Sequence, residues 1–170
     1  MAARTPALGP VDGNSGSKLD WFVQPTMVLQ TRRGPAGTSK VTLSVAVTNP
    51  KRKLEESYVE RSFKGALELG QHRVVLAVYL PREASDVSTA GEPIFLAGPD
   101  PPMRVVLLRY VVPFASTKWV RVSFTLPPRF GSLRLLPGGR YNPMVVWNDG
   151  VATSDAIPVE LVWRAEDEPA

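Results

Sequence analysis

The sequence contains no cysteine and only one histidine, His72. Without thiols the chain can form neither a disulfide nor a cysteine-ligated zinc site. A Ser-His-Asp arrangement would have to use His72, which stands just before an apolar run, where we expect a turn or edge histidine with no special role. No H-E-x-x-H, G-x-G-x-x-G or calcium-loop spacing is present either. We therefore expect a protein that is not an enzyme and that uses no cofactor or metal ion.

Long apolar runs are absent as well. None approaches the roughly 20 residues that a membrane-spanning helix requires. The first residues, Met1 to Pro6, lack the apolar stretch of a signal peptide. We expect a soluble, non-secreted protein without a membrane segment, and the lack of cysteine is consistent with a reducing cytoplasm.

Short apolar runs make up most of the chain between Lys40 and Arg164, and Pro, Gly, Asn or Asp ends each of them. The clearest is Val41 to Thr48, in which valine and leucine alternate with smaller or polar residues until Asn49-Pro50 ends the run. The 13 glycines and 17 prolines are typical of the corners of an all-β fold. The sequence thus predicts a single antiparallel β-sandwich of eight to ten strands.

The expected strands follow from the same alternation. A first strand ends near Arg33, and the others cover 41–48, 63–69, 73–80, 94–96, 104–112, 119–126, 133–136, 144–147 and 159–163. The segment Gly34 to Lys40 resembles a phosphate-binding loop, but its lysine does not directly follow the second glycine and no helical pattern comes after it, so we predict a hairpin turn. The charged stretch 51–60 is the only candidate for a short helix.

Three regions are expected along the chain. Residues 1–18 are rich in Gly, Pro and Ser with few large apolar side chains, which predicts a flexible N-terminal arm. Residues 19–165 form the sandwich domain, and residues 166–170 form an acidic C-terminal tail.

The net charge of +4 favours a polyanionic partner, although many proteins with such an excess bind no nucleic acid. The cations that could contact RNA phosphates, without reading sequence, lie in the arm, the first turn and the loop after the second strand. They are Arg4, Lys18, Arg32, Arg33, Lys51, Arg52 and Lys53. Solvated turns would show the same pattern.

Carboxylates gather in the later loops and in the tail. If copies of the chain brought them together, they would repel one another until protons or divalent cations neutralised them. The candidates for such a subunit interface are Asp149, Asp155, Glu166 and Asp167. The alternative is that they only solvate loops and keep the tail soluble.

Three stretches of the second half, Arg73 to Ser88, Pro102 to Tyr110 and Tyr141 to Glu166, resemble coat proteins of small isometric RNA plant viruses, with the cucumovirus and bromovirus proteins nearest. The resemblance covers roughly residues 66–168 and rests on strand order, spacing and loop lengths. It implies an eight-stranded jelly roll, many copies of which form a shell around single-stranded RNA in the virion and in the host cytoplasm. Those coat proteins carry an Arg-rich arm, whereas residues 1–18 contain only Arg4 and Lys18.

The sequence therefore favours a self-assembling viral coat protein of jelly-roll type that takes no small-molecule substrate. The loops 98–102 and 127–131 are expected to supply subunit contacts. An alternative is a non-enzymatic interaction module, as a viral matrix or movement-type protein would be, that binds a protein or an anionic membrane surface. A third reading is a sugar-binding sandwich that uses Trp119, Trp147 and Trp163, but their positions in apolar strands favour core packing.

Overall fold

The computed structural model describes residues 3–12, 22–51, 67–130, 132–136, 143–148, 150–156 and 158–162, with backbone alone for residues 3–12, 159, 161 and 162. These residues contain twelve strands: β1 (Ala3–Asp12), β2 (Gln24–Arg33), β3 (Ser39–Asn49), β4 (His72–Pro81), β5 (Ser85–Ser88), β6 (Ile94–Asp100), β7 (Met103–Val112), β8 (Ser116–Leu126), β9 (Ser132–Leu136), β10 (Val145–Asn148), β11 (Val151–Ser154) and β12 (Val159–Val162).

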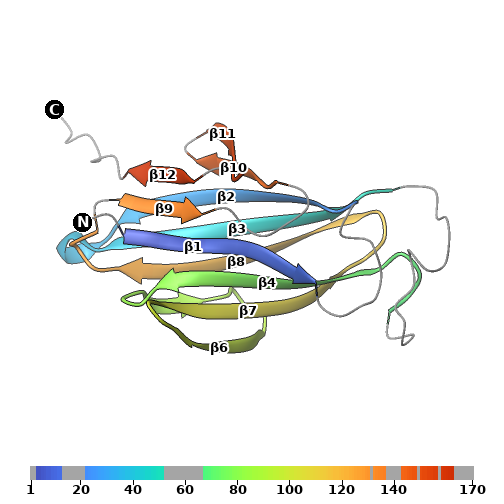
Figure 1. Ribbon diagram of the computed structural model, residues 1–170, viewed down its shortest axis with the longest axis horizontal. Helices are drawn as coiled ribbons and strands as arrows, with labels where there is room; N and C mark the ends of the chain where they lie inside the picture. Colours follow the sequence, from blue (N-terminus) through green and yellow to red (C-terminus); the bar gives the residue numbers. More distant parts are fainter. Residues whose placement is uncertain are drawn as a thin grey trace.

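The strands form two six-stranded sheets that pack face to face (Figure 1). The first sheet has the order β12-β9-β1-β4-β7-β6, and the second has the order β11-β10-β2-β3-β8-β5. Strands β6 and β5 are therefore the edges on one side of the molecule, and β12 and β11 are the edges on the other. The chain is an all-β sandwich, as the sequence predicts.

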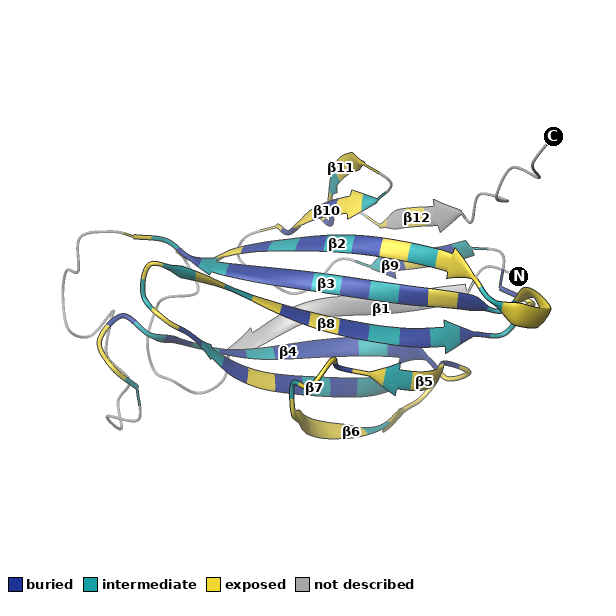
Figure 2. Ribbon diagram, turned by 180° about the vertical axis from the view of Figure 1, so that it is seen from behind, coloured by how far each residue is buried: buried dark blue, intermediate teal, exposed yellow. Residues whose placement is uncertain are grey.

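Alternation along the strands creates the core between the sheets. In β3 the odd-numbered residues from Val41 to Val47 are buried, whereas Thr42, Ser44 and Thr48 are partly exposed (Figure 2). Because successive side chains of a strand point to opposite faces, every second side chain packs inward and the side chains between them form the outer surface. The neighbouring strand β8 contributes Val120, Val122, Phe124 and Leu126 to the same core.

The predicted hairpin turn between β2 and β3 is confirmed. The amide of Gly34 donates a hydrogen bond to the carbonyl of Thr38 at 2.8 Å, and the amide of Thr38 donates to the carbonyl of Pro35 at 3.2 Å. Ala36 and Gly37 have φ values of 53° and 76°, so the chain reverses through two left-handed residues.

Most of the expected strands are present, but three were not predicted. The extra strands are β1, β5 and β11, which raise the number from the expected eight to ten to twelve among the described residues. The strand expected over 63–69 is wrong for residues 67–69, which lie in a bend and a turn. The rest of that stretch and the expected helix after Lys51 lie outside the described residues.

The first part of the predicted flexible arm is a strand. Strand β1 pairs antiparallel with β4 through Leu8 to Asp12 and parallel with β9 through Ala3 to Ala7. The prediction depended on the shortage of large apolar side chains, whereas strand pairing uses backbone hydrogen bonds that nearly every residue can supply. The prediction of an arm is therefore wrong for Ala3–Asp12. The remainder of the arm and the acidic tail lie outside the described residues.

Two pairs of strands are parallel, β1 with β9 and β2 with β10. The predicted sandwich of jelly-roll type was antiparallel throughout, so these two pairings refine it. Each joins segments that lie far apart in the chain. No local pattern signals such a pairing, because alternation specifies which face of a strand is buried but not which strand lies beside it.

Tyr110 of β7 lies at the margin of the core, next to Lys118 of β8. Its side chain is 5% exposed, and in the described structure its hydroxyl has no hydrogen-bond partner. The ammonium of Lys118 lies 5.5 Å from the centre of the ring and 2.9 Å from a carboxylate oxygen of Glu92. Burial, with a smaller contribution from the charge of Glu92, raises the pKa of Tyr110 well above its usual range.

We expect Tyr110→Phe to leave stability near pH 8 unchanged or to raise it by about 1 kcal/mol, because the variant buries no unpaired hydroxyl. The advantage of the variant should grow above about pH 10, where tyrosine ionises in the unfolded chain while folding holds Tyr110 protonated. This group then lowers the stability of the wild type by up to about 1.4 kcal/mol per pH unit. Urea unfolding of both proteins near pH 8 and near pH 11 measures the difference. Tyr79→Phe, at a partly exposed outward position, is the control, and a difference that does not change with pH contradicts the prediction.

Candidate functional site

The outward face of the second sheet carries three cations near one end. In the strand register Arg32 of β2 lies opposite Lys40 of β3, and Arg121 of β8 lies opposite Ser44 of β3. The residues on either side of these positions in β3 and β8 point into the core. Alternation therefore directs all three cations outward.

A groove of about 400 Å³ lies between these cations. Its lining includes amide and hydroxyl side chains from three adjacent strands, namely Gln30, Thr42 and Ser123. Gln30 and Ser123 both lie opposite Thr42 in the register, so they form one row across the sheet, between the row of Arg32 and the row of Arg121. The groove thus combines positive charge with neutral hydrogen-bonding groups.

The tight turn Thr89–Glu92 forms one wall. The hydroxyl of Thr89 donates a hydrogen bond to the carbonyl of Glu92, whose amide donates back to the carbonyl of Thr89. Ala90 and Gly91 have φ values of 52° and 94°, as a type I′ turn requires. A second hollow of about 280 Å³ also contacts Ala90 and Arg121 and is lined by Trp119. We call the two hollows together the basic groove.

Trp119 lies in the row next to Arg121 and is 55% exposed. We expected Trp119 and Trp147 to pack in the core, and this is wrong for both, since Trp147 is 42% exposed. Trp163 lies outside the described residues. The sequence of β8 did contain the correct signal, because Trp119 is in phase with Arg121 and out of phase with the buried residue Val120.

No carboxylate of the described residues forms a salt bridge with Arg32, Lys40 or Arg121. The acid beside the groove, Glu92, pairs with the ammonium of Lys118 at 2.9 Å. The positive charge of the groove is therefore not neutralised by the described part of the chain.

The structure does not gather the predicted RNA-binding residues into one patch. Arg32 and Arg33 are exposed at the end of β2, whereas Lys51 is exposed beyond the far end of β3, roughly 35 Å away along the strand direction. Arg4 belongs to β1, where its backbone lies opposite Arg134. Lys18, Arg52 and Lys53 lie outside the described residues. Of the predicted residues whose side chains the structure describes, only Arg32 belongs to the basic groove, and sequence reasoning missed Lys40 and Arg121.

Strand β6, an edge of the first sheet, exposes consecutive apolar side chains. Ile94, Phe95 and Leu96 are 46%, 53% and 56% exposed. The register with β7 shifts between Ile94 and Leu96, and the guanidinium of Arg109 lies 4.4 Å from the centre of the Phe95 ring. Leu96 lies opposite the partly exposed Leu107, so the apolar surface continues onto β7. We call the surface of Ile94, Phe95 and Leu96 the β6 edge.

The hairpin of β10 and β11 exposes a second apolar group, and β11 is the edge strand of the second sheet. Val145, Trp147 and Val151 are 42%, 42% and 65% exposed. We call this surface the β11 edge. Figure 1 shows the β6 edge and the β11 edge on opposite sides of the sandwich. Exposed apolar edges of sheets are places where a second chain can pair or pack.

Asp155 does not offer its carboxylate to a neighbouring subunit. It is 2% exposed, and its Oδ1 accepts a hydrogen bond from the amide of Met144 at 2.6 Å. The amide of Asp155 donates to the carbonyl of Met144 at 3.1 Å, so the residue after β11 is tied to the residue before β10. The prediction of an interface role is wrong for Asp155, because the carboxylate is enclosed by its own chain. Asp149, Glu166 and Asp167 lie outside the described residues.

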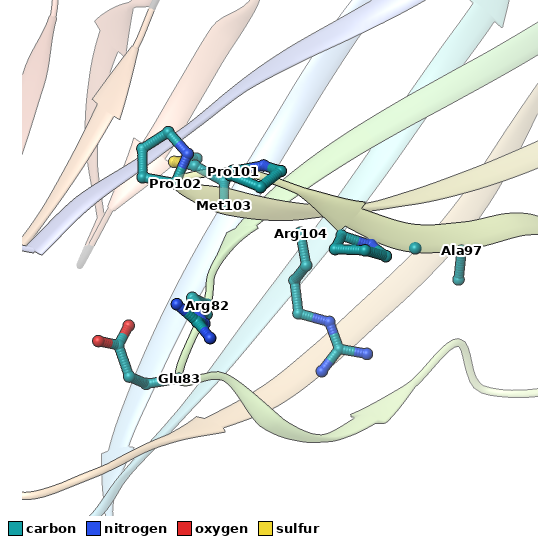
Figure 3. A pocket seen from close by; sticks show the side chains of 9 residues that line it. Arg82, Glu83, Ala97, Pro101, Pro102, Met103 and Arg104 are labelled. Carbon is teal, nitrogen blue, oxygen red and sulfur yellow. The ribbon is translucent and has the colours of Figure 1, made fainter.

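A hollow of about 690 Å³ lies beside the turn from β6 to β7, and residues 98, 99, 101 and 102 of the predicted contact loop line it (Figure 3). Arg104 reaches from β7 towards the segment after β4 and donates a hydrogen bond to the carbonyl of Ala84 at 3.0 Å. Glu83, also in the lining, pairs with Arg129. Arg104 therefore ties β7 to the segment between β4 and β5, and Glu83 ties the same segment to the turn after β8, so these charged groups have a structural explanation.

His72 is the first residue of β4 and is 2% exposed, so it lies in the interior rather than in a turn. In the described ranges no three His, Cys, Asp or Glu residues come together to hold a metal ion. Those ranges also contain no helix that is long and apolar enough to cross a membrane. No protein-family model, curated protein or solved structure matches the chain.

Proposed function

We propose that the protein is a structural protein of the viral coat type, which self-assembles into a shell and packages RNA. The observation that carries this proposal is the pair of apolar surfaces on opposite sides of the sandwich, the β6 edge and the β11 edge. Contact between the β6 edge of one copy and the β11 edge of the next is head to tail. Such contacts repeat from copy to copy, and they give a closed assembly where the rotation between neighbouring copies allows closure.

Burial of both edges supplies the driving force. Side chains such as Leu96 and Val151 lose apolar surface to water in the assembly, which is worth about 25 cal/mol for each Å² removed. The backbone groups along the free sides of β6 and β11 can add hydrogen bonds if the strands pair. Neither contribution requires a catalytic group.

The basic groove supports the second half of the proposal. Arg32, Lys40 and Arg121 can displace the counterions of a polyanion, an interaction that needs no particular nucleotide sequence. Packaging then depends on salt, whereas the apolar contacts between copies depend on it less.

Two measurements on the purified protein, at low and at high salt, test the proposal. Size-exclusion chromatography with light scattering gives the mass, and the ratio of absorbance at 260 and 280 nm gives the nucleic-acid content. We expect a species of many 18.6 kDa chains that carries nuclease-protected nucleic acid. A species of one or two chains under both conditions, free of nucleic acid, contradicts the coat function. It would favour an interaction module whose basic groove meets an acidic protein or an anionic membrane.

A further inference from the structure

We infer that the basic groove on the outward face of the second sheet binds single-stranded nucleic acid, with phosphates on Arg32, Lys40 and Arg121 and one base stacked on Trp119. This inference rests on the proposed function and gives it a site other than the N-terminal arm and the loops. It also identifies the face of the sandwich that meets the nucleic acid.

The order of the groups along the sheet fits a polynucleotide strand. Arg32 and Lys40 form the first row, the hydroxyls of Thr42 and Ser123 form the second, and Arg121 and then Trp119 follow. Ala46 of β3 lies opposite Trp119. It is six residues from Lys40, which is a distance of about 20 Å along the strand. A backbone following this line would meet cations first, then hydrogen-bonding hydroxyls, and then an aromatic ring.

The positive charge of the basic groove is available to bind phosphates. In the described part of the chain neither Arg32 nor Lys40 nor Arg121 has a carboxylate partner, and Lys118 holds the nearby Glu92. Thr42 and Ser123 are neutral and can donate hydrogen bonds to phosphate oxygens. The row between the cations therefore adds contacts without adding repulsion.

The shape of the groove favours a single strand over a duplex. The turn Thr89–Glu92 stands beside the groove as a wall, and Ala90 contacts both hollows. Trp119 is 55% exposed within the second hollow, next to Arg121. Only an unpaired base can lay its face on such a ring, and stacking of this kind accepts any base. We therefore expect binding without strong sequence preference.

Fluorescence anisotropy with a labelled oligouridylate of about twelve nucleotides tests the inference. The double variant Lys40→Gln with Arg121→Gln should bind about tenfold or more weakly, and the salt dependence of its affinity should be shallower by about 1.4 in the log–log slope. The matched control is Arg73→Gln with Arg134→Gln, which removes the same charge from the first sheet. Equal affinities for the two double variants overturn the inference.

A second variant separates stacking from charge. Trp119→Leu should weaken binding by at least about fivefold while leaving the salt slope unchanged, whereas Tyr79→Leu, which replaces a partly exposed aromatic side chain of the first sheet, should bind as the wild type does. Binding should also quench tryptophan fluorescence in the wild type and not in Trp119→Leu. Loss of affinity in both aromatic variants, or in neither, contradicts the stacking role.

Two comparisons identify the ligand class and separate this inference from the proposed function. Equal binding of a duplex, or binding of phosphatidylserine vesicles with none of the oligonucleotide, overturns the single-strand assignment. Oligonucleotide binding by a chain that never assembles supports the groove and contradicts the coat function. Assembly into empty shells, with no oligonucleotide binding by the dispersed chain, contradicts the groove and the packaging of RNA and supports only self-assembly.

Discussion

Replacing Leu96 by lysine should dissociate the assembled protein. Leu96 is 56% exposed on the edge strand β6 and continues an apolar surface that includes Phe95 and Leu107. A lysine there would place a charge in a contact that must lose its water, and disruption of a central contact of this kind typically costs about 2 kcal/mol or more. The dissociation constant should rise at least about thirtyfold. Light scattering across a concentration series measures the shift.

A matched control is available in Leu69, which is 46% exposed in the turn before β4 and belongs to neither edge. Leu69→Lys makes the same chemical change at a similar exposure and should leave the assembly intact. If both lysine variants dissociate equally, added charge rather than the β6 edge explains the result.

Mixing two variants tests whether the contact is head to tail. Leu96→Lys retains an intact β11 edge, and Val151→Lys retains an intact β6 edge. Each alone should remain a single chain of 18.6 kDa, whereas the mixture should form a species of about twice that mass and grow no further. If Val151→Lys alone forms dimers, the β6 edge contacts another β6 edge instead.

The sequence predicts the sandwich because its signal is local. Alternation in stretches such as Val41 to Thr48 specifies a buried face, and Asn49-Pro50 ends the run, so these residues alone are enough to predict β3. Strands β5 and β11, with the sequences SDVS and VATS, contain one large apolar residue each, whereas the equally short β10 and β12 contain enough apolar residues to be predicted. Strand β1 lacks the apolar pattern, because its place between β4 and β9 depends on backbone pairing.

The basic groove shows why the candidate site is harder to predict than the fold. Cations that are neighbours in the chain stand out in the sequence, and those that the structure describes, Arg32 with Arg33 and Lys51, lie at opposite ends of β3. Lys40 and Arg121 are separated by most of the domain and meet only because β3 pairs with β8. Each has the pattern of an ordinary outward-facing strand residue. The prediction that Lys40 and Arg121 each point outward is correct, but it cannot show that the two side chains lie on the same face of the second sheet.

Asp155 illustrates the opposite error. Its neighbours Ser154 and Ala156 suggest a polar loop, yet the carboxylate turns inward to the amide of Met144. Sequence alone does not show whether a loop carboxylate solvates the surface or closes a turn, because both occur beside glycine and serine. The difference matters for function, since Asp155 supports the hairpin that presents the β11 edge.

Asn49→Ala should produce the largest loss of stability among single polar substitutions. Asn49 is fully buried at the end of β3, and its Nδ2 donates to the carbonyls of Gly70 at 2.8 Å, Pro113 at 3.1 Å and Val112 at 3.4 Å. One amide thereby ties the end of the second sheet to two segments of the first. Removal leaves buried carbonyls without this donor, so the free energy of unfolding should fall by about 2–4 kcal/mol. Urea denaturation measures this loss.

Two companion variants distinguish the lost donor from lost packing. Asn49→Asp keeps the size of the side chain but replaces the amide donor by oxygen that faces carbonyl oxygens, so it should be at least as destabilising as Asn49→Ala. Thr48 is the neighbour of Asn49 in the chain, and its hydroxyl forms an exposed hydrogen bond with the hydroxyl of Thr117. Thr48→Val removes that bond and should lower the free energy of unfolding by no more than about 1 kcal/mol. If Asn49→Asp is as stable as the wild type, the amide is not what joins the sheets. If Thr48→Val costs as much as Asn49→Ala, the end of β3 is sensitive to any change, and burial of the amide does not explain the effect.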